Sequence, residues 1–511
     1  MLFNSYDFVF VFLPVTLCVF FVFGRFNRLL AAGWLVLASI AFYGYWSPKY
    51  IPLLLGSVTF NFLAGRFISR NAGRSSAKMM LVIAITINLL LLGFYKYCDF
   101  FLTIANDMAG VHLPLLRIVL PIGISFFTFT QIAFLVDARR GLAREYSFVH
   151  YSLFATYFPH LIAGPILHHS EIIPQFTSTS PYSVSARSFG IGLTVFSIGL
   201  AKKVLIADPC GDMVSPIFAA AHGGIPIRLF AAWVGVLAYT FQLYFDFSGY
   251  TDMAIGISKL FGVDLPINFY SPYKSSSIIQ FWQRWHMTLS RFLRDYLYFP
   301  LGGNRKGKLR RYMNLMITML LGGLWHGANY TFVIWGGLHG FYLMINHAWR
   351  SVIRPSQRTS FVGTLGAGAM TFLAVVIAWV FFRAEDVSTA FNILSGMAGI
   401  NGIAVHDSSG KFWEAFTHLF PRYTVVSGGA LQLLRSLPTR LEMVALFLGA
   451  GVLLWATPNT QQLVERIEIA CEAIDARAPF YRYVVPSLSG VLLVFTLSQM
   501  QKASTFLYFQ F

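Results

Sequence analysis

The segment from Gly322 to Asn329 places a histidine, His326, inside a long apolar run of the sequence. An ionisable side chain at membrane depth is costly, so such a residue is by default a candidate for function. A neutral imidazole bonded to a neighbouring helix is the structural alternative. Three glycines, Gly322, Gly323 and Gly327, would leave space beside the ring for another backbone or a ligand. Asn329, three residues after the histidine, could fix the tautomer of the ring.

A second histidine, His286, lies forty residues upstream in a segment rich in basic and aromatic residues. If residues 280–298 form a helix, Ser290 follows His286 by one turn and Arg291 pairs with Asp295. An interfacial charged face with snorkelling side chains would explain the same charges. Two histidines, one within the membrane and one in a basic segment at its entrance, suit proton transfer during acyl transfer.

Other kinds of chemistry find little support in the sequence. His168 and His169 lie near Glu171, but adjacent side chains on a regular element point apart and no third ligand follows at helical spacing. The four cysteines show no CxxC spacing, so neither a zinc site nor a disulfide framework is indicated. GxSxG, HExxH and P-loop motifs do not occur. We therefore expect no metal and no bound cofactor.

The composition describes a polytopic membrane protein. Of 511 residues, 56% are hydrophobic and only 12% are charged, and the mean hydropathy is +0.62, which is unlike a soluble globular chain. The net charge of +17 would be compatible with nucleic-acid binding. The lysines and arginines, however, fall in short clusters between apolar runs, which is typical of cytoplasmic membrane loops, so no nucleic-acid partner is expected.

Apolar windows of about 20 residues predict a series of membrane helices, the first of which is a retained span and not a signal peptide. Basic clusters near residues 25–28, 66–78 and 139–144 occupy alternate loops, so we expect these loops in the cytoplasm and the N-terminus outside. The candidate spans are 7–24, 29–46, 50–68, 79–96, 116–136, 148–165, 186–206, 229–247, 312–330, 331–349, 361–382, 441–457 and 484–500, with a marginal run at 249–263.

Two segments depart from this pattern. Residues 275–311 interleave arginines and lysines with aromatic residues and are too polar to span unaided, so they read as a re-entrant or interfacial segment facing the cytoplasm. That placement requires the run at 249–263 to cross or half-cross the membrane. Residues 384–440 form the one long extramembrane loop and are expected outside. A single integral membrane domain, 1–511, covers the chain.

Several blocks in order resemble the membrane-bound O-acyltransferase family, and specifically its bacterial alginate O-acetylation branch. The match runs nearly end to end. The blocks are "PIGISFFTF" (121–129), "FPHLIAGPI" (158–166), "AKKVLIAD" (201–208), "YFDFSGYTDMAIG" (244–256), "FWQRWHMTLSRFLRDYLYFPLGGNR" (281–305), "LGGLWHGANYTFVIWGGLHG" (321–340) and "FLYFQF" (506–511).

The resemblance implies an all-α fold in which a ring of tilted helices with re-entrant segments surrounds a thinned centre. The family's catalytic histidine falls on His326, and its second signature position falls on His286. Gln283 stands where alginate-type members often carry arginine. Funnels from the two faces would meet at His326, where burial favours the neutral imidazole that can act as a base.

The implied activity is O-acyl transfer in the bacterial inner membrane, and we expect the acyl group to be acetyl. The donor would be acetyl-CoA or another acyl thioester on the cytoplasmic side, and the acceptor a secreted, alginate-like polysaccharide. Transfer of D-alanyl or another acyl group to a cell-wall polymer is one alternative, and a transporter of polysaccharide precursors is another. Besides lipids, the resemblance implies an extracytoplasmic acetyltransferase as partner. The expected substrate-binding residues are Arg284, Trp285, Ser290, Arg291, Arg294, Asp295, Trp325 and Asn329.

Overall fold

A computed structural model describes residues 1–144, 147–178, 180–352, 360–403, 440–472, 480–500 and 506–507, and within these ranges the regular structure is entirely helical. The longer helices are α1 (Leu13–Phe26), α2 (Arg28–Trp46), α3 (Ile51–Arg70), α4 (Ser75–Ala109), α5 (Ile124–Arg140), α6 (Phe148–Thr156), α8 (His169–Thr177), α9 (Ala186–Ala201), α10 (Asp208–His222), α11 (Leu229–Leu260), α14 (Gly307–His326), α15 (Tyr330–Val352), α16 (Phe361–Arg383), α17 (Val387–Met397), α20 (Arg440–Trp455), α21 (Thr460–Glu472) and α22 (Val485–Gln499).

Short helical segments join or extend these helices. They are η1 (Asp7–Phe12), η2 (Pro48–Tyr50), α7 (Phe158–Leu161), η3 (Ser180–Tyr182), η4 (Lys202–Ala207), η5 (Pro272–Lys274), α12 (Ile278–Trp282), α13 (Met287–Leu293), η6 (Arg294–Tyr298) and η7 (Phe480–Val484).

Seven of the described helices are long and apolar enough to cross a membrane, or eight if the bent pair α20 and α21 counts as one span. Large apolar side chains such as Leu63, Leu90 and Phe361 are exposed on them. In water such exposure would be costly, but in lipid it is the expected outer surface of a helix. The all-α, polytopic membrane fold expected from the sequence is therefore confirmed.

The predicted span at 79–96 is too short, because α4 continues to Ala109. Its 35 residues extend about 50 Å at 1.5 Å per residue, which exceeds the hydrocarbon thickness of a bilayer. The hydropathy falls in the segment "YKYCDFFLTIANDMA", yet this segment contains no proline or glycine to end the helix. The span predicted to begin at residue 116 starts later for the opposite reason, since α5 follows Gly123, which has a positive φ of 72°.

The predicted span at 148–165 is not a span. It forms α6 and α7, which are separated by Tyr157, and every residue from 151 to 167 is buried within the protein. Pro159 follows the break and lacks the N–H that a continuous helix would need. An apolar run of this length is equally typical of a buried core segment, so hydropathy alone could not separate the two.

The marginal run at 249–263 is the C-terminal half of α11, a single helix of 32 residues. Its low hydropathy comes in part from Asp252, which is buried and forms an ion pair with Lys202 at 2.7 Å. Just before the run, Asp246 forms an ion pair with Lys203 at 2.6 Å. Buried charges require such partners, so the polar content reflects packing between α11 and η4.

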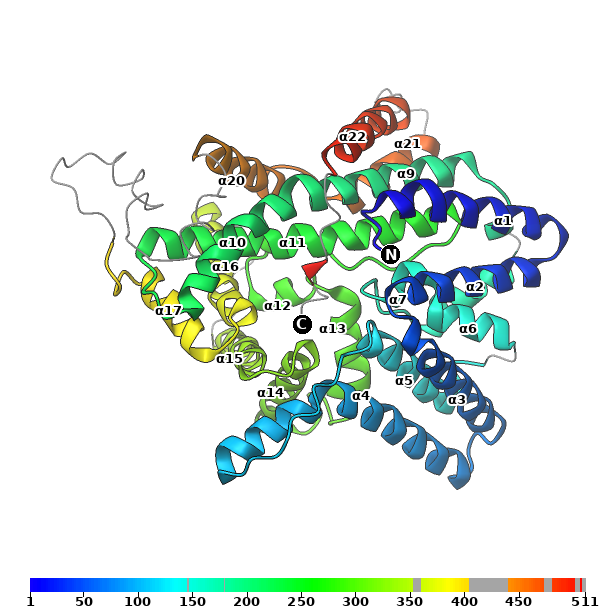
Figure 1. The fold of residues 1–511 in the computed structure, drawn as a ribbon, viewed down its shortest axis with the longest axis horizontal. Helices are drawn as coiled ribbons and strands as arrows, with labels where there is room; N and C mark the ends of the chain where they lie inside the picture. The colour runs from blue at the N-terminus through cyan, green and yellow to red at the C-terminus, as the bar shows by residue number, and fades with distance from the viewer. Residues whose placement is uncertain are drawn as a thin grey trace.

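Residues 275–311 form short helices connected by turns, α12, α13 and η6, before α14 begins. In Figure 1 the longer helices surround the middle of the molecule, and α12 and α13 lie within that ring. The last described residues also pack there, because the ring of Phe506 stacks on Tyr250 of α11 at 4.5 Å. The expected ring of helices with short inserted segments is thus observed. In the predicted loop 384–440, α17 forms the first part, and residues 404–439 lie outside the described residues.

Candidate active site

Helices α14 and α15 form a closely packed antiparallel hairpin that carries His326 at its tip. A Cβ atom on Gly323 would lie 2.2 Å from the carbonyl oxygen of Phe332, and one on Gly336 would lie 2.3 Å from that of Met319. Only glycine permits this approach, which is also found in membrane helix pairs. The space that the glycines were expected to open beside His326 is therefore filled by the backbone of α15 and, at Gly327, by the Phe332 ring.

His326 is the last residue of α14 and is buried, with 6% of its surface exposed. Three aromatic rings surround it edge-on: the ring centroids of Trp325, Trp335 and Phe382 lie 4.9, 5.1 and 5.1 Å away. Such an apolar enclosure disfavours an imidazolium and excludes bulk water. The structure thus agrees with the prediction that the imidazole of His326 is buried.

Two side chains of α4 bind the C-terminal end of α14. The ammonium of Lys96 donates to the carbonyl oxygens of Trp325 and, at 3.0 Å, of His326. The hydroxyl of Tyr97 donates to the carbonyl oxygen of Leu324 at 2.9 Å. The last carbonyls of a helix have no partner within the helix and carry partial negative charge. A cation and a hydroxyl from α4 therefore fix the end of the helix where His326 lies.

His286 lies in a tight turn between α12 and α13, and its φ is +42°. A left-handed conformation is unfavourable for a histidine, and neighbouring backbone bonds stabilise it. The amide of Tyr270 donates to the carbonyl of Arg284 at 3.0 Å, and the amide of Met287 donates to the carbonyl of Asn268 at 3.0 Å. The expected continuous helix over 280–298 is thus wrong, because it is interrupted at this turn.

The indole of Trp325 lies close to both histidines. Its ring centroid is 6.3 Å from that of His286 and 4.9 Å from that of His326. The His286 ring is fully buried, and Phe247 of α11 packs edge-on against it at 4.7 Å. The structure thus brings together three of the predicted site residues, although forty positions separate the two histidines in the sequence.

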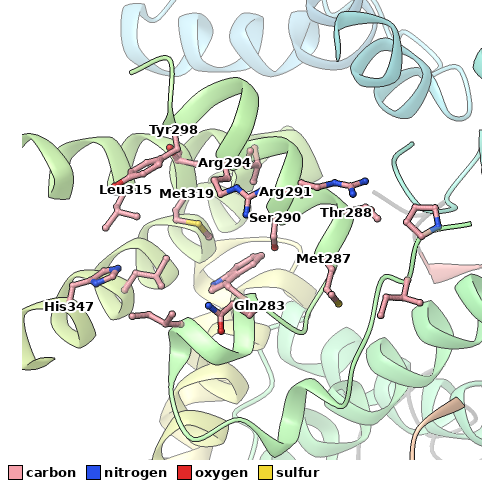
Figure 2. A pocket seen from close by; sticks show the side chains of 17 residues that line it. Gln283, Met287, Thr288, Ser290, Arg291, Arg294, Tyr298, Leu315, Met319 and His347 are labelled. Carbon is pink, nitrogen blue, oxygen red and sulfur yellow. The ribbon is translucent and has the colours of Figure 1, made fainter. Parts of the chain in front are cut away.

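A cavity of about 640 Å³ lies beside the turn that holds His286 (Figure 2). Met287 and Thr288, the two residues after the histidine, contribute to its wall, and Met319 and Leu343 contribute from the α14–α15 hairpin. Its polar lining comes mainly from residues of the α12–η6 segment together with His347 of α15. These polar residues are Gln283, Thr288, Ser290, Arg291, Arg294, Tyr298, Thr318 and His347.

The arginines of this segment are paired differently from the prediction. Arg291 forms a two-fold ion pair with Glu171 of α8, at 2.6 and 2.9 Å, and not with Asp295. Asp295 instead accepts from Arg294 at 2.7 and 3.1 Å. The prediction assumed one regular helix, whereas the chain changes to π-helical geometry at η6. Arg291 and Arg294 line the cavity, and Arg284 does not.

The other predicted binding residues have varied surroundings. Ser290 lines the cavity, and its hydroxyl donates to the carbonyl of Trp285 at 3.3 Å. Trp285 is buried and stacks on Phe281 at 5.6 Å, so it belongs to the core behind the site.

Asn329 does not orient His326. Its amide donates to the carbonyl of Glu385 at 2.7 Å, and its oxygen accepts from the amide of Thr331 at 3.0 Å. The expectation assumed a helix through residue 329, whereas α14 ends at His326. Asn329 therefore organises the connection between α14 and α15.

A second cavity, of about 580 Å³, lies at the tip of the hairpin. Ala328, Asn329 and Tyr330 line it there, together with Lys96 and other residues of α4. The lining includes four carboxylates, those of Asp99 and Asp107 of α4 and those of Glu385 and Asp386. Met319 of α14 lines the first cavity, and Ala328, in the connection between α14 and α15, lines the second. Along the chain, His326 lies between these two residues.

The side chains near His168 form a hydrogen-bonded group with η6. The hydroxyl of Tyr296 donates to Asp137 at 2.7 Å and lies 3.1 Å from Nδ1 of His168. Glu171 is occupied by Arg291, and His169 packs against Phe134 at 5.3 Å. Within the described ranges, no group of three metal-ligating side chains occurs.

Three further residues close to the histidines were not identified from the sequence. Asn268 bonds His286, Lys96 bonds the end of α14, and His339 accepts from the indole N–H of Trp282 at 3.2 Å. Of these three, Lys96 could have been identified from the sequence, because it is an ionisable residue at the end of a predicted span. Asn268 and His339 meet their partners through tertiary packing.

A polytopic helical protein whose inserted segments enclose two buried histidines has the features expected of a membrane-bound acyltransferase. The family model for membrane-bound O-acyltransferases matches residues 16–384, and the chain belongs to this family. It is an O-acyltransferase, and it is a multi-pass protein of the bacterial inner membrane.

Curated relatives support this assignment. The chain is 43% identical to a peptidoglycan O-acetyltransferase of Helicobacter pylori over 432 residues, which cover 79% of this chain and 81% of the relative. It is 40% identical to a probable alginate O-acetylase of Pseudomonas aeruginosa over 404 residues, 78% of this chain and 75% of the relative. A teichoic acid D-alanyltransferase of Streptococcus thermophilus is 28% identical over 284 residues, 51% of this chain and 68% of the relative.

Proposed function

We propose that this protein takes acetyl groups from a cytoplasmic acyl thioester, acetyl-CoA, and moves them across the inner membrane for O-acetylation of a secreted polysaccharide. The observation that carries this proposal is the position of the histidines relative to the two cavities. Neither histidine ring lines a cavity itself, but Met287 and Thr288, directly after His286, line the one beside α13, and Ala328, two residues after His326, lines the one at the hairpin tip. An acyl group could therefore pass between two openings while its carrier stays on one side.

The charge distribution supports the orientation of the two cavities. α4 begins after Arg74, and α14 begins after the basic residues Arg305 and Lys306. The cavity at the hairpin tip lies instead near the C-terminal parts of α4 and α14 and carries carboxylates. Because basic residues favour the cytoplasmic side, we place the cavity beside His286 towards the cytoplasm and the acidic cavity towards the outside.

In the proposed reaction, an acceptor hydroxyl attacks the acyl carbon of the thioester. A C–O bond forms, the C–S bond breaks, and the hydroxyl proton must finally reach the sulfur. His326 acts as general base on the hydroxyl, or relays the acyl group, and His286 contacts the donor. Arg294, which is half-exposed at the cavity beside His286, attracts the anionic donor.

The polymer is proposed only as a class, a secreted polysaccharide such as an alginate-like exopolysaccharide. The relatives named for peptidoglycan and alginate O-acetylation are nearly equally similar to this chain, at 43% and 40% identity. D-Alanyl transfer is the second candidate, and it is favoured by more distant relatives, which match about half of this chain. Membership of an acyltransferase family disfavours the transporter alternative.

A separate extracytoplasmic acetyltransferase is proposed to complete the modification. Acyl transfer requires reacting atoms about 3 Å apart, and His326 is enclosed by rings and helices. A bulky polymer could not reach it, so a partner must collect the acyl group at the acidic cavity. Residues 411–423, whose aromatic and basic residues we propose as an anchor for this partner, lie outside the described residues. Deleting 405–425 should abolish polymer acetylation in cells and spare slow thioester hydrolysis by the purified chain.

The proposed donor can be tested with the full chain in proteoliposomes. Acetyl-CoA labelled in the acetyl group is supplied to the outer surface, and free CoA thiol is measured with time for the wild type and for His326→Ala. The proposal requires that thiol release depends on His326. It also requires that release occurs only on protein whose cytoplasmic face lies on the outer surface of the vesicle. Release from a D-alanyl carrier but not from acetyl-CoA would contradict the acetyl donor and favour the alternative.

A further inference from the structure

Asn268 makes several contacts around His286, and the geometry determines which of its side-chain atoms is the oxygen. The backbone amide of Thr288 donates to Oδ1 of Asn268 at 3.3 Å. The hydroxyl of Thr288 donates to the same atom at 2.8 Å and accepts from the amide of Ile166 at 3.0 Å. A backbone N–H can only donate, so the atom that faces it must be an acceptor.

This orientation determines the protonation of the His286 ring. Nδ1 of His286 lies 3.1 Å from the same oxygen of Asn268. Two lone pairs facing each other at this distance would repel, so Nδ1 must carry a hydrogen and donate it. A neutral imidazole has one N–H, which leaves Nε2 unprotonated.

The free nitrogen of His286 is fully enclosed. The residue has no exposed surface, and among the described residues Nε2 has no hydrogen-bond partner. Phe247 packs against the ring from α11, and Trp325 lies on the side of His326. A buried polar atom without a partner is costly, so an N–H, O–H or S–H group of a bound substrate would satisfy it.

We propose that Asn268 is a positioning residue that holds His286 in the Nδ1–H tautomer, so that His286 meets the substrate as a proton acceptor through Nε2. This inference rests on the proposed function for the identity of the donor. It also restricts the proton transfers that His286 can perform. A neutral ring with a free Nε2 cannot protonate the leaving thiolate at the outset. It can pass to the sulfur only a proton that it has first received, which in the proposed reaction is the one that His326 takes from the acceptor hydroxyl.

The tautomer can be measured directly on the full chain in lipid, with ¹³C and ¹⁵N labels in its histidines. The ring carbon and nitrogen shifts distinguish the two neutral tautomers, and subtraction of the His286→Asn spectrum assigns the signal. The proposal requires the Nδ1–H form at His286 in the wild type. An Nε2–H signal, or an equal mixture of the two, would overturn it.

Substitutions of Asn268 then separate positioning from packing. Asn268→Leu should remove the Nδ1–H signal and lower thiol release from acetyl-CoA about 10- to 100-fold. Asn268→Asp keeps an acceptor oxygen at nearly the same volume, and it should restore the tautomer and most of the rate. An Asn268→Leu protein that retains the wild-type tautomer would contradict the inference.

A matched control is available in Asn88 of α4, which is as buried as Asn268 and bonds Asn61 of α3. Asn88→Leu should leave both the His286 signal and thiol release unchanged, and an equal loss in this control would mean that Asn268 acts through general packing. If the wild type releases no thiol from acetyl-CoA, the proposed donor fails, whereas the tautomer measurement still decides the role of Asn268.

Discussion

The ammonium of Lys96 in α4 lies 3.0 Å from the carbonyl oxygen of His326 in α14. The same group binds the carbonyl of Trp325, so one cation holds the backbone of two adjacent site residues. The interaction joins a membrane span near the start of the chain to the hairpin that carries the histidine. Because α14 ends at His326, no further helical turn supports this residue.

Lys96→Met should therefore impair acyl transfer more than it impairs folding. Methionine has a similar length and is apolar, so a membrane helix tolerates it, but it cannot donate a hydrogen bond to the carbonyls of Trp325 and His326. A displacement of about 1 Å at a catalytic group can lower the rate about 100-fold. We expect a loss of about 10- to 100-fold in the rate of thiol release, with normal membrane insertion, and partial recovery in Lys96→Arg. Wild-type activity of Lys96→Met would show that Lys96 does not position His326.

The two arginines of the cavity beside His286 should behave differently. Arg294→Gln removes a half-exposed cation from the cavity wall and should raise the KM for acetyl-CoA about tenfold with little change in kcat. Arg291→Gln leaves Glu171 without its partner, so its main effect should be a lower thermal stability in detergent. Steady-state kinetics and melting curves of both variants check this division. A raised KM in Arg291→Gln at unchanged stability would reverse the assignment.

Substitutions of His286 test whether an acceptor nitrogen is required or only its position. Asparagine keeps a polar side chain with an acceptor oxygen, so His286→Asn should retain part of the activity. His286→Leu removes every polar atom and should be inactive. Thiol release by both variants, purified in equal amounts, gives the comparison. An equal and complete loss in both would contradict this expectation, because it would mean that the imidazole itself is needed and that the acceptor oxygen of asparagine cannot replace Nε2.

The orientation of the chain can be tested with single cysteines in a background without the native ones. Residues 66–78, 139–144 and 305–311 should be labelled only from the cytoplasm. A cysteine at Asp107, which lines the acidic cavity, should react from outside. A membrane-impermeant maleimide labels cysteines on the outer face in intact cells and cysteines on the cytoplasmic face in inverted vesicles. Labelling of residue 306 from outside would place the donor cavity on the wrong face.

The sequence predicted the fold class, which the structure confirms, and it singled out two histidines that are both buried in the structure. Apolar windows detect helices that face lipid, and His326 stood out because a titratable group was surrounded by apolar residues. The same windows failed at 148–165, because a segment buried in protein and a segment buried in lipid have the same hydropathy. They also ended α4 too early, since its last part is polar yet still helical.

The residues that hold the site together were harder to predict. Lys96 lies 230 positions from His326 in the sequence, and Asn268 reaches His286 only because the chain turns at a residue with positive φ. The pairing of Arg291 with Glu171 depends on a break in helical periodicity that local spacing does not indicate. Contacts of this kind arise from tertiary packing, which a single sequence does not show.

The central claim is that His326 performs the chemistry, and His326→Ala tests it most directly. Alanine favours the helix that ends here, so insertion and expression should be normal. Loss of a general base lowers a rate about 10²- to 10⁴-fold, and we expect this loss both in thiol release from acetyl-CoA by the purified chain and in acetyl groups on the secreted polymer of cells that carry the variant. Wild-type rates from a normally inserted His326→Ala protein would contradict the account.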